Sequence, residues 1–415
     1  MNRFNIDVSD LYHSVKHLQE NGLVFQYNDE LEYDGRTITV NNKKLLHLAN
    51  CSYLGLEKHA ALIDGAIEAV KKHGTQNSMS RAMLSSHLYK ELESYLSQIF
   101  PGYQIVFPTS TLAHCSTLPL LIKENDAIIL DAYVHNSVRM ASQLCRANGT
   151  FSIISKHNDM AHIKYLIKRL KKDGYKNIWY CADGIYSMHG NLCDVEGLHK
   201  LLDEEENFYA YVDDAHGIGC YGKNGCGYVI GNFGLHEKMI VVGSFAKSIA
   251  VNGGIIIVPD KILADYIRLT GQTSIFSGPI QPASLGALIA SMKFHLSDEL
   301  PKYQNELSEL IHYFRNKCEE YELPIVTKDI TPIQLIRIGS TENVLKIQRR
   351  LIDKGFFPTA AVYPAVSEGD GGIRISITRH IKKTDMDKLL VNMKEILETE
   401  NLHVKEDKLV NIQDN

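Results

Sequence analysis

Short apolar runs alternate with amphipathic helical stretches through the middle of this chain. The seven runs are rich in β-branched and aromatic residues and cover 104–107, 127–130, 151–154, 178–181, 208–212, 239–242 and 254–258. The stretches between them, such as 136–147, 160–173 and 194–206, carry apolar residues at helical spacing. This alternation predicts βαβ units and a mostly parallel sheet. Because the runs are nearly continuous in apolar residues, both faces of that sheet should be covered.

The pattern changes near residue 296. A long amphipathic helix over about 299–320 precedes two more β-rich runs, 333–337 and 373–377, with helices over 342–354 and 383–399. Residues 401–415 are polar and are expected to fray. The sequence therefore predicts an N-terminal arm and segment over 1–60, a large α/β domain over 61–295, and a small α+β domain with a polar tail over 296–415.

Composition excludes several classes of protein. The 415 residues carry a net charge of -5, which argues against a nucleic-acid partner. No apolar run approaches the roughly 18 residues of a membrane span, and the first residues lack the apolar core of a signal peptide. The 8 cysteines form no CxxC pair and no HExxH motif is present, so a metal site is not indicated. We expect a cytoplasmic protein with reduced thiols and no metal.

Polar residues follow the predicted strands at their carboxyl ends, where open α/β sheets bind ligands. Asp213, Asp214 and His216 follow the run 208–212. Such groups are costly to bury unless paired or liganded, and a helix start with solvated charges is the alternative. Ser244 and Lys247 follow the run 239–242. A lysine among small residues is a candidate Schiff-base amine, and an ordinary surface lysine is the alternative.

Three further loops carry candidate groups. Ser110 and Thr111 follow the run 104–107 at a hydroxyl-rich helix start, which offers backbone N–H groups to an anion unless it is only an ordinary N-cap. His135 follows the run 127–130, and Ser187 follows 178–181. Five polar strand ends in one sheet, including an acid, a lysine and a histidine, indicate a cofactor with a phosphate and a heterocycle.

Taken together, these loops resemble the α-oxoamine synthase family of pyridoxal-phosphate (PLP) enzymes, which have fold type I. The resemblance runs from about Leu46 to about Leu397. The motifs that carry it are, in order, Tyr53-Leu-Gly-Leu56, His135, His157-Asn-Asp159, Ser187-Met-x-Gly190, Val212-Asp-Asp-Ala-His-Gly217, Ser244-Phe-Ala-Lys247, Gly253-Gly254, Phe276-Ser277 and Ile373-Arg-Ile-Ser376.

The resemblance implies a role for each residue around the cofactor ring. Lys247 matches the lysine that holds PLP covalently, and Asp213 matches the acid that pairs with the pyridine nitrogen. His216 matches the residue that hydrogen-bonds the phenolic oxygen of the ring, and Ser187 should lie near that oxygen. His135 matches the histidine that stacks on the ring face. Catalysis would thus depend on Lys247, His135, Asp213 and His216.

The resemblance also implies how phosphate and substrate are bound. Ser110 and Thr111 match the positions whose backbone amides cradle the phosphate, and Ser244 matches the hydroxyl that binds it. Arg374 matches the arginine that takes the substrate carboxylate as a bidentate pair.

The implied reaction condenses an amino acid with an acyl thioester, with loss of the thiol and of CO2, to give an α-amino ketone. Lys247 would remove the Cα proton, and His135 would help to polarise the thioester. The acyl group would come from acyl-CoA or from an acyl carrier protein, and the family forms homodimers. An aminotransferase or lyase of the same fold is the alternative, and an inactive partner subunit is a third reading that the presence of Lys247 disfavours.

Several positions depart from the family pattern and leave the amino-acid donor open. The phosphate loop reads Thr109-Ser110-Thr111 in place of Ser-Gly-aromatic, and His114 stands where an asparagine is usual. Cys51 replaces another asparagine, and Cys226 replaces an arginine. The predicted helix over 162–172 is basic, which suits an acidic carrier protein or a solvated helix face.

Overall fold

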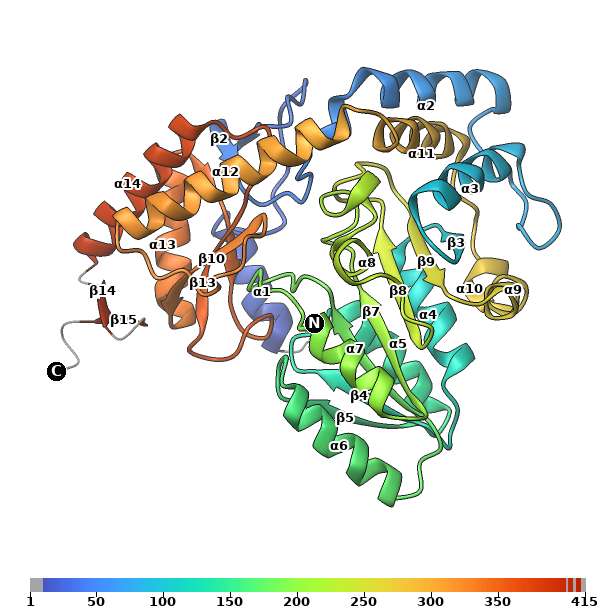
Figure 1. The fold of residues 1–415 in the computed structure, drawn as a ribbon. Helices are drawn as coiled ribbons and strands as arrows, with labels where there is room; N and C mark the ends of the chain where they lie inside the picture. Colours follow the sequence, from blue (N-terminus) through green and yellow to red (C-terminus); the bar gives the residue numbers. More distant parts are fainter. Residues whose placement is uncertain (1–9, 401, 406–407, 412–415) are drawn as a thin grey trace, which may run out of the picture. The chain divides into compact units, whose positions relative to one another are not determined.

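The computed structural model describes residues 10–400, 402–405 and 408–411 (Figure 1). Contacts divide the chain into two compact units. The large unit takes in Cys51–Ile311 and Thr327–Pro332. The small unit takes in the described residues of Met1–Asn50, His312–Val326 and Ile333–Asn415. Each unit is described by itself below.

Seven strands form one sheet in the large unit, in the order β3-β9-β8-β7-β6-β4-β5. They are β3 (Tyr103–Phe107), β4 (Ala127–Asp131), β5 (Phe151–Ser155), β6 (Ile178–Asp183), β7 (Phe208–Asp213), β8 (Met239–Ser244) and β9 (Gly254–Val258). Strands β4 to β8 pair in parallel, whereas β9 is antiparallel to both β3 and β8. The predicted mostly parallel sheet is confirmed. β9 is the exception because residues 245–253 are too few for a parallel crossover.

Helices cover both faces of this sheet (Figure 1). Alternate strand residues such as Phe107, Leu130 and Tyr211 pack against α4, α5 and α9, while α6 and α7 lie against the strands on the other side. The helices of the large unit are α2 (Ala60–His73), α3 (His87–Ile99), α4 (Ser110–Leu121), α5 (Asn136–Ala147), α6 (Met160–Lys172), α7 (Val195–Glu204), α8 (Tyr228–Phe233), α9 (Lys261–Thr270), α10 (Gln272–Ile275) and α11 (Pro282–His295). Two short 3-10 turns are η1 (Leu56–Lys58) and η2 (Lys223–Gly225). The large unit is therefore an α/β fold of three layers.

The small unit has the predicted α+β character. One sheet has the order β10-β13-β12 and the other β1-β2-β11. Their strands are β10 (Ile333–Gly339), β12 (Thr359–Ala361), β13 (Gly371–Ser376), β1 (Thr37–Val40), β2 (Lys43–His47) and β11 (Phe356–Phe357). The helices are α1 (Asp10–Glu20), α13 (Thr341–Asp353) and α14 (Lys383–Thr399), and α12 (Leu300–Glu320) is shared between the two units.

The expectation of a frayed C-terminal tail is wrong for two segments. β14 (Leu402–Lys405) and β15 (Lys408–Asn411) pair as an antiparallel ribbon, and Leu402 is buried. The other residues of 401–415 lie outside the described ranges.

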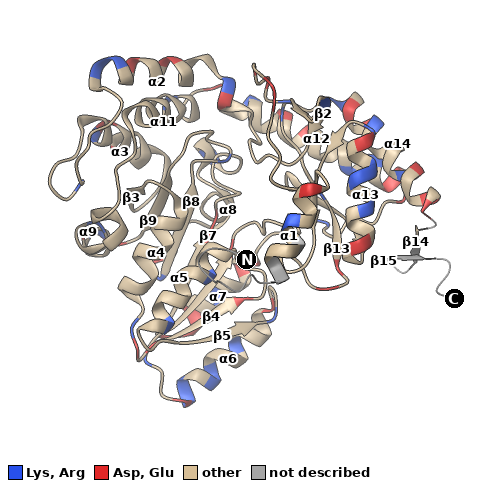
Figure 2. Cartoon of the chain, turned by 180° about the vertical axis from the view of Figure 1, so that it is seen from behind, with Lys and Arg blue, Asp and Glu red and all other residues tan. Residues whose placement is uncertain are grey.

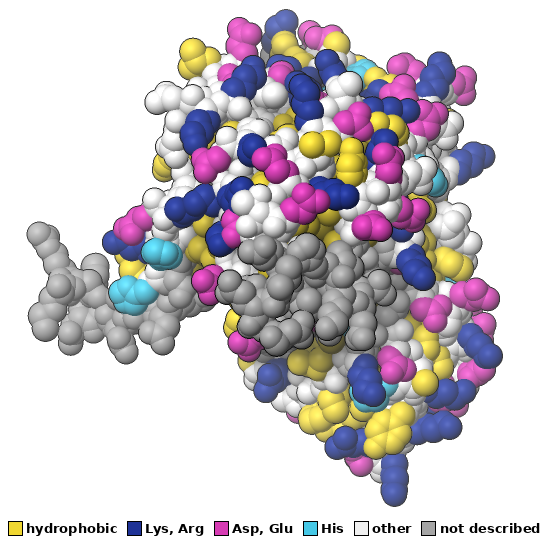
Figure 3. Space-filling view, turned by 90° about the vertical axis from the view of Figure 1, so that its left-hand side faces the viewer, with side chains coloured by type: hydrophobic (Ala, Val, Ile, Leu, Met, Phe, Trp, Pro, Cys, Tyr) yellow, Lys and Arg dark blue, Asp and Glu magenta, His cyan; other side chains and the backbone are white. Residues whose placement is uncertain are grey.

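Surface features agree with the composition. Within the described ranges, every helix is too short or too polar to cross a membrane. On the face drawn in Figure 3, basic and acidic side chains are interspersed over the part of the surface that the structure describes. Such mixing gives little long-range attraction for a nucleic-acid backbone.

A close crossing of α2 and α11 supports the large unit beside the sheet (Figure 1). A Cβ atom at Gly286 would lie 2.2 Å from the carbonyl oxygen of Gly65, and one at Gly65 would lie 2.6 Å from that of Gly286. Neither distance is possible without a shift of backbone. Glycine at both positions is therefore required by packing, although glycine lowers helix propensity.

We predict that Gly286→Ala lowers the free energy of unfolding by about 1–3 kcal/mol, because the added methyl group forces the two helices apart. Helix propensity alone would change that free energy by roughly 0.5–1 kcal/mol in the opposite direction. Thermal and urea unfolding measure the difference. The control is Gly278→Ala, where the added Cβ meets no atom within 4 Å. A Gly286→Ala protein as stable as the wild type would contradict this account of the crossing.

Candidate active site

Two carboxyl groups lie side by side where β6 and β7 end. Asp183 and Asp213 are register partners on these parallel strands, and they are 2% and 5% exposed. The next helical element after β7 is η2, so the alternative of a helix start with solvated charges is wrong for Asp213 and Asp214. Buried carboxyl groups need partners, and those partners decide which of them is charged.

Asp213 is held by a buried histidine. Nε2 of His114 lies 3.0 Å from Asp213 Oδ2, and the backbone N–H of Ala215 donates to Oδ1 at 3.0 Å. Burial by itself raises the pKa of this carboxyl, but the charge and hydrogen bond of His114, followed by the charges of Lys247 and His135, outweigh it. The pKa of Asp213 is thus held below its ordinary value, and the group is ionised.

The pKa of Asp183 is shifted in the opposite direction from that of Asp213. Burial, and then the negative charge of Asp213, raise the pKa of Asp183 well above its ordinary value. The backbone N–H of His135 donates to Asp183 Oδ1 at 3.0 Å, which offsets only part of that shift. Of the two adjacent carboxyl groups, Asp213 is therefore the one on which a negative charge is favoured.

Asp214 is buried in a cradle of glycines. A Cβ atom at Gly184, Gly217 or Gly227 would lie within 2.1–2.4 Å of its carboxyl oxygens. Oδ2 accepts from the backbone N–H of Val229 at 3.0 Å, and Oδ1 has no hydrogen-bond partner among the described residues. Burial raises the pKa of Asp214 to about 8. This carboxyl holds the loop between β7 and α8 in shape.

Lys247 lies in the turn after β8, which ends at the buried Ser244. The lysine is half-buried, and its positive charge contributes to the pKa values of Asp213, Asp183 and His135. An isolated surface lysine would have no such influence on buried carboxyl groups. The structure thus brings Lys247 to the same end of the sheet as the two acids.

His216 is fixed by an aromatic partner that the sequence did not assign. The hydroxyl oxygen of Tyr53 lies 2.6 Å from Nδ1 of His216, and both side chains are buried. Tyr53 opens the motif Tyr53-Leu-Gly-Leu56, so the motif was visible although the contact was not. The pair orients the imidazole three residues beyond Asp213.

His135 forms the N-cap of α5. Its Nδ1 lies 2.7 Å from Ser137 Oγ, and its backbone N–H is bound to Asp183. Part of the ring is open to solvent, yet desolvation by the surrounding protein, together with the charge of Lys247, lowers the pKa of the imidazole. His135 is therefore neutral at physiological pH.

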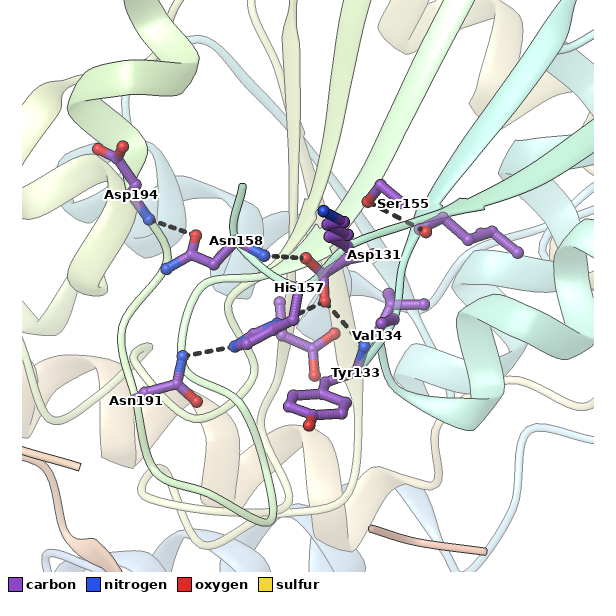
Figure 4. Close-up of polar contacts among 12 residues, drawn as sticks. Asp131, Tyr133, Val134, Ser155, His157, Asn158, Asn191 and Asp194 are labelled. Carbon is purple, nitrogen blue, oxygen red and sulfur yellow. Dashed lines mark hydrogen bonds and ion pairs between the residues drawn. The ribbon is translucent and has the colours of Figure 1, made fainter. Parts of the chain in front are cut away.

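A second ionised carboxylate lies before His135 (Figure 4). Asp131, at the end of β4, accepts from His157 Nδ1 at 2.7 Å, from the N–H groups of Asn158 and Tyr133 at 2.8 Å, and from the hydroxyl of Tyr180 at 2.9 Å. Burial raises the pKa of Asp131, but His157 and the two N–H groups bring it below its ordinary value. These bonds shape the loop 131–135 that presents His135.

The same network borders the loop that contains Ser187. The ring of Tyr133 stacks on His189 with centroids 4.3 Å apart, and Nε2 of His157 lies 2.8 Å from the amide of Asn191. Neither Asp131 nor Tyr133 was predicted as a site residue. In the motif His157-Asn-Asp159, Asp159 caps α6 and His157 binds Asp131.

The start of α4 is suited to an anion. The side chain of Thr109 caps the helix by accepting from Leu112 N, and the N–H groups of Ser110 and Thr111 make no hydrogen bond within the described ranges. A Cβ at Gly254 would lie 2.5 Å from Ser110 N, so glycine is needed to bring β9 this close. His114, one turn further along α4, connects this helix start to Asp213. A phosphate at one end and a protonated ring nitrogen at the other therefore fit the residues present.

Arg374 belongs to the small unit. It lies on β13 with 5% exposure, and its Nη1 donates to Ser376 Oγ at 2.8 Å. Within the part of the chain that the structure describes, no group of three or more His, Cys, Asp or Glu is arranged to hold a metal ion. The eight other predicted site residues all belong to the large unit.

Comparisons with known proteins extend over most of the chain. It is 31% identical to the serine palmitoyltransferase of Bacteriovorax stolpii, covering 90% of this chain and 87% of that protein. It is 28% identical to the 8-amino-7-oxononanoate synthase of Alkaliphilus metalliredigens, covering 86% and 89%. A structure of serine palmitoyltransferase from S. paucimobilis with bound PLP has a TM-score of 0.85 at 21% identity, covering 94% of this chain and 97% of that one, which shows the fold.

A family model described as aminotransferase class I and II matches residues 43–392. Both kinds of relative are α-oxoamine synthases, so the resemblance noted from the sequence is confirmed, as are the fold type and the PLP cofactor. The chain therefore belongs to the aminotransferase class I and II family, and within it to the α-oxoamine synthases, which are PLP-dependent acyltransferases.

Proposed function

We propose that this chain condenses an amino acid with an acyl thioester, releasing the thiol and CO2, to give an α-amino ketone. The single observation that carries the proposal is the ionised, buried Asp213, which lies at the same sheet end as Lys247 and is held there by His114. A buried carboxylate of this kind suits a protonated pyridine ring. Bound PLP supplies an electron sink for the charge that develops at the substrate Cα.

The residues that would hold PLP surround this point. Asp213 would pair with the ring nitrogen, and Lys247 would hold the cofactor covalently. The N–H groups of Ser110 and Thr111 would bind the phosphate, aided by the buried hydroxyl of Ser244. His216, fixed by Tyr53, and Ser187 would serve the phenolic oxygen, and His135 would cover the ring face.

Two groups would handle protons and the acyl carbonyl. The ε-amine of Lys247, once released, would take the Cα proton, because no other half-buried amine lies after β8 in this turn. His135 is neutral at physiological pH, so it would donate a hydrogen bond to the thioester carbonyl without adding a charge. Ser137 and Asp183 fix the position of His135 for that role.

Arg374 would select a donor with a free α-carboxylate. Its guanidinium is buried on the middle strand of its sheet, and Nη1 donates to Ser376 Oγ, which helps to fix its orientation. A guanidinium binds a carboxylate through two parallel hydrogen bonds.

We also propose a homodimer. Four large apolar side chains of the large unit are exposed, namely Met83, Leu84, Leu269 and Phe276. The exposed fraction is 80% at Met83 and 84% at Phe276. They border or adjoin the residues that line a cavity of about 590 Å³, among them Ala82, Leu269 and Ile275. Apolar surface of this kind is normally covered in the working protein, and a second copy of the chain would cover it.

We propose a CoA thioester rather than a carrier protein as the acyl donor. α6 is coloured blue at several positions in Figure 2, which marks its Lys and Arg residues. However, three of these cations are already paired within the large unit. The pairs are Lys164–Glu204, Lys171–Glu205 and Arg169–Asp173. Paired charges give weak attraction to an acidic carrier, so a solvated helix face is the better interpretation of α6.

The 8 free thiols support a reducing, cytoplasmic location.

We predict that Lys247→Ala lowers thiol release from acyl-CoA in the presence of the amino-acid donor by roughly 10²–10⁴-fold, because the covalent anchor and the base are both lost. Release is followed with a thiol reagent, and CO2 is measured in parallel. Lys261→Ala is the matched control, since Lys261 is an exposed lysine paired with Asp265 on α9. Thiol release by Lys247→Ala at the wild-type rate would exclude this role. Amino-group transfer without thiol release would favour the aminotransferase alternative.

We predict that Arg374→Lys raises the donor concentration needed for a half-maximal change in cofactor absorbance by about 10- to 100-fold, because lysine cannot form the bidentate pair. The KM for the acyl thioester should stay within about twofold. Arg349→Lys makes the same change at an exposed position of α13 and should have no effect. If both parameters of Arg374→Lys match the wild type, the donor carboxylate is bound elsewhere.

We predict that Phe276→Glu shifts the protein toward monomer in sedimentation velocity, because the carboxylate would be buried in the contact between copies. Tyr165→Glu introduces the same charge at an exposed aromatic of α6 and should leave the assembly unchanged. A wild-type protein that sediments as a monomer at micromolar concentration would overturn the proposed homodimer.

A further inference from the structure

His114 is a buried titratable group that the proposed reaction does not use. It lies on α4, one turn after Ser110, with 0% exposure. Both ring nitrogens have partners: Nδ1 lies 3.0 Å from the hydroxyl oxygen of Tyr211, and Nε2 lies 3.0 Å from Asp213 Oδ2. The sequence marked this position as a departure, because a histidine stands where asparagine is usual.

The positions of the protons follow from the partners. Asp213 is ionised and can only accept, so Nε2 of His114 carries a proton and donates it to Oδ2. Burial raises the pKa of Tyr211 well above its ordinary value, so its hydroxyl stays protonated and can donate to Nδ1. Nδ1 and the hydroxyl of Tyr211 thus share a second hydrogen bond, which fixes the plane of the imidazole while Nε2 faces Asp213.

The hydrogen bond with His114 distinguishes two carboxyl groups that are otherwise alike. Asp183 and Asp213 are adjacent, end neighbouring strands and are both buried. Two such groups cannot both be ionised at low cost, so one of them keeps a proton. Of the two carboxyl groups, Asp213 alone is hydrogen-bonded to His114, whereas Asp183 accepts from the backbone N–H of His135 within the described part of the chain. The imidazole thus biases the negative charge toward Asp213.

We propose that His114 is a positioning residue that assigns the negative charge of this carboxyl pair to Asp213 and fixes the orientation of that carboxylate toward the cofactor ring. The inference rests on the proposed function only in that Asp213 faces the ring nitrogen. It goes further by stating that an amide donor at this place, but not an apolar side chain, can replace the histidine.

The surroundings of Asp213 contain other charged groups that the experiment must take into account. They are Asp183 on β6, Asp214 after β7, Lys247 after β8 and His135 before α5. Of these four groups, Lys247 and His135 lower the pKa of Asp213. The charge of His114 lowers that pKa more than either of them does.

The test compares His114→Gln with His114→Leu. The amide nitrogen of glutamine reaches about as far as Nε2 and donates without titrating, whereas leucine fills a similar volume without a donor. The dissociation constant of PLP is measured by fluorescence between pH 6 and 9. We expect His114→Leu to weaken PLP binding about 10- to 100-fold, most strongly at low pH, and His114→Gln to stay within about threefold of the wild type.

A double variant separates positioning from packing. If His114 acts through Asp213, then Asp213→Asn with His114→Leu binds PLP no more weakly than Asp213→Asn alone. Carboxyl ¹³C NMR of the cofactor-free protein gives a second readout, in which Asp213 should take up a proton at a higher pH in His114→Leu than in the wild type. His114→Met, which is also apolar and lacks a donor, replaces the leucine variant if that variant does not fold.

Each outcome decides the proposal. Equal PLP affinity and pH profile in His114→Leu and the wild type would overturn it, as would equal losses in His114→Leu and His114→Gln, which indicate packing alone. The proposed function can fail separately. A wild-type protein that binds PLP but releases no thiol would remove the condensation reaction and leave the assignment of charge intact.

Discussion

A negative charge sits at the end of β7 in a place from which water is almost excluded. Burial alone would protonate Asp213, and the hydrogen bond from His114 together with the positive charges nearby reverses that tendency. The arrangement depends on the parallel sheet, which brings the carboxyl ends of β6, β7 and β8 to one edge. It depends equally on α4, whose first turn would bind the phosphate and whose second turn supplies the imidazole.

Four buried acids follow the strands of this sheet, and their charges differ for local reasons. Asp131 and Asp213 are ionised because each accepts from a histidine and from backbone N–H groups. Asp183 and Asp214 lack such a partner, so desolvation dominates and raises the pKa of each. The same residue type at this edge of the sheet thus has a lowered pKa at two positions and a raised pKa at two others. Asp213 at the end of β7 has a lowered pKa, and its register partner on β6 is Asp183, whose pKa is raised.

The sequence alone predicted the strands and the loops that carry the site residues. It did not predict which side chains contact one another. Each apolar run became a strand within one or two residues, because runs buried on both faces are hard to mistake. The antiparallel course of β9 follows from the short segment 245–253, which an apolar pattern does not report. Likewise, Tyr53 and His114 were visible as letters in motifs. Their contacts with His216 and Asp213 join segments about 100 to 160 residues apart, and no local pattern encodes such distances.

The neutral state of Asp183 and Asp214 has a consequence for the phosphate of the cofactor. With those two acids uncharged, the charged side chains at this end of β6, β7 and β8 are Asp213 and Lys247, of opposite sign. A phosphate that arrives at the start of α4 must then be balanced by the N–H groups of that helix and by hydroxyls such as that of Ser244. Helix dipoles and neutral donors stabilise an anion at such a place without a further buried cation. This is why the change from a glycine-aromatic pair to Ser110-Thr111 is compatible with phosphate binding. The donors that matter belong to the backbone, and their geometry is set by the Thr109 cap and by the close approach of Gly254.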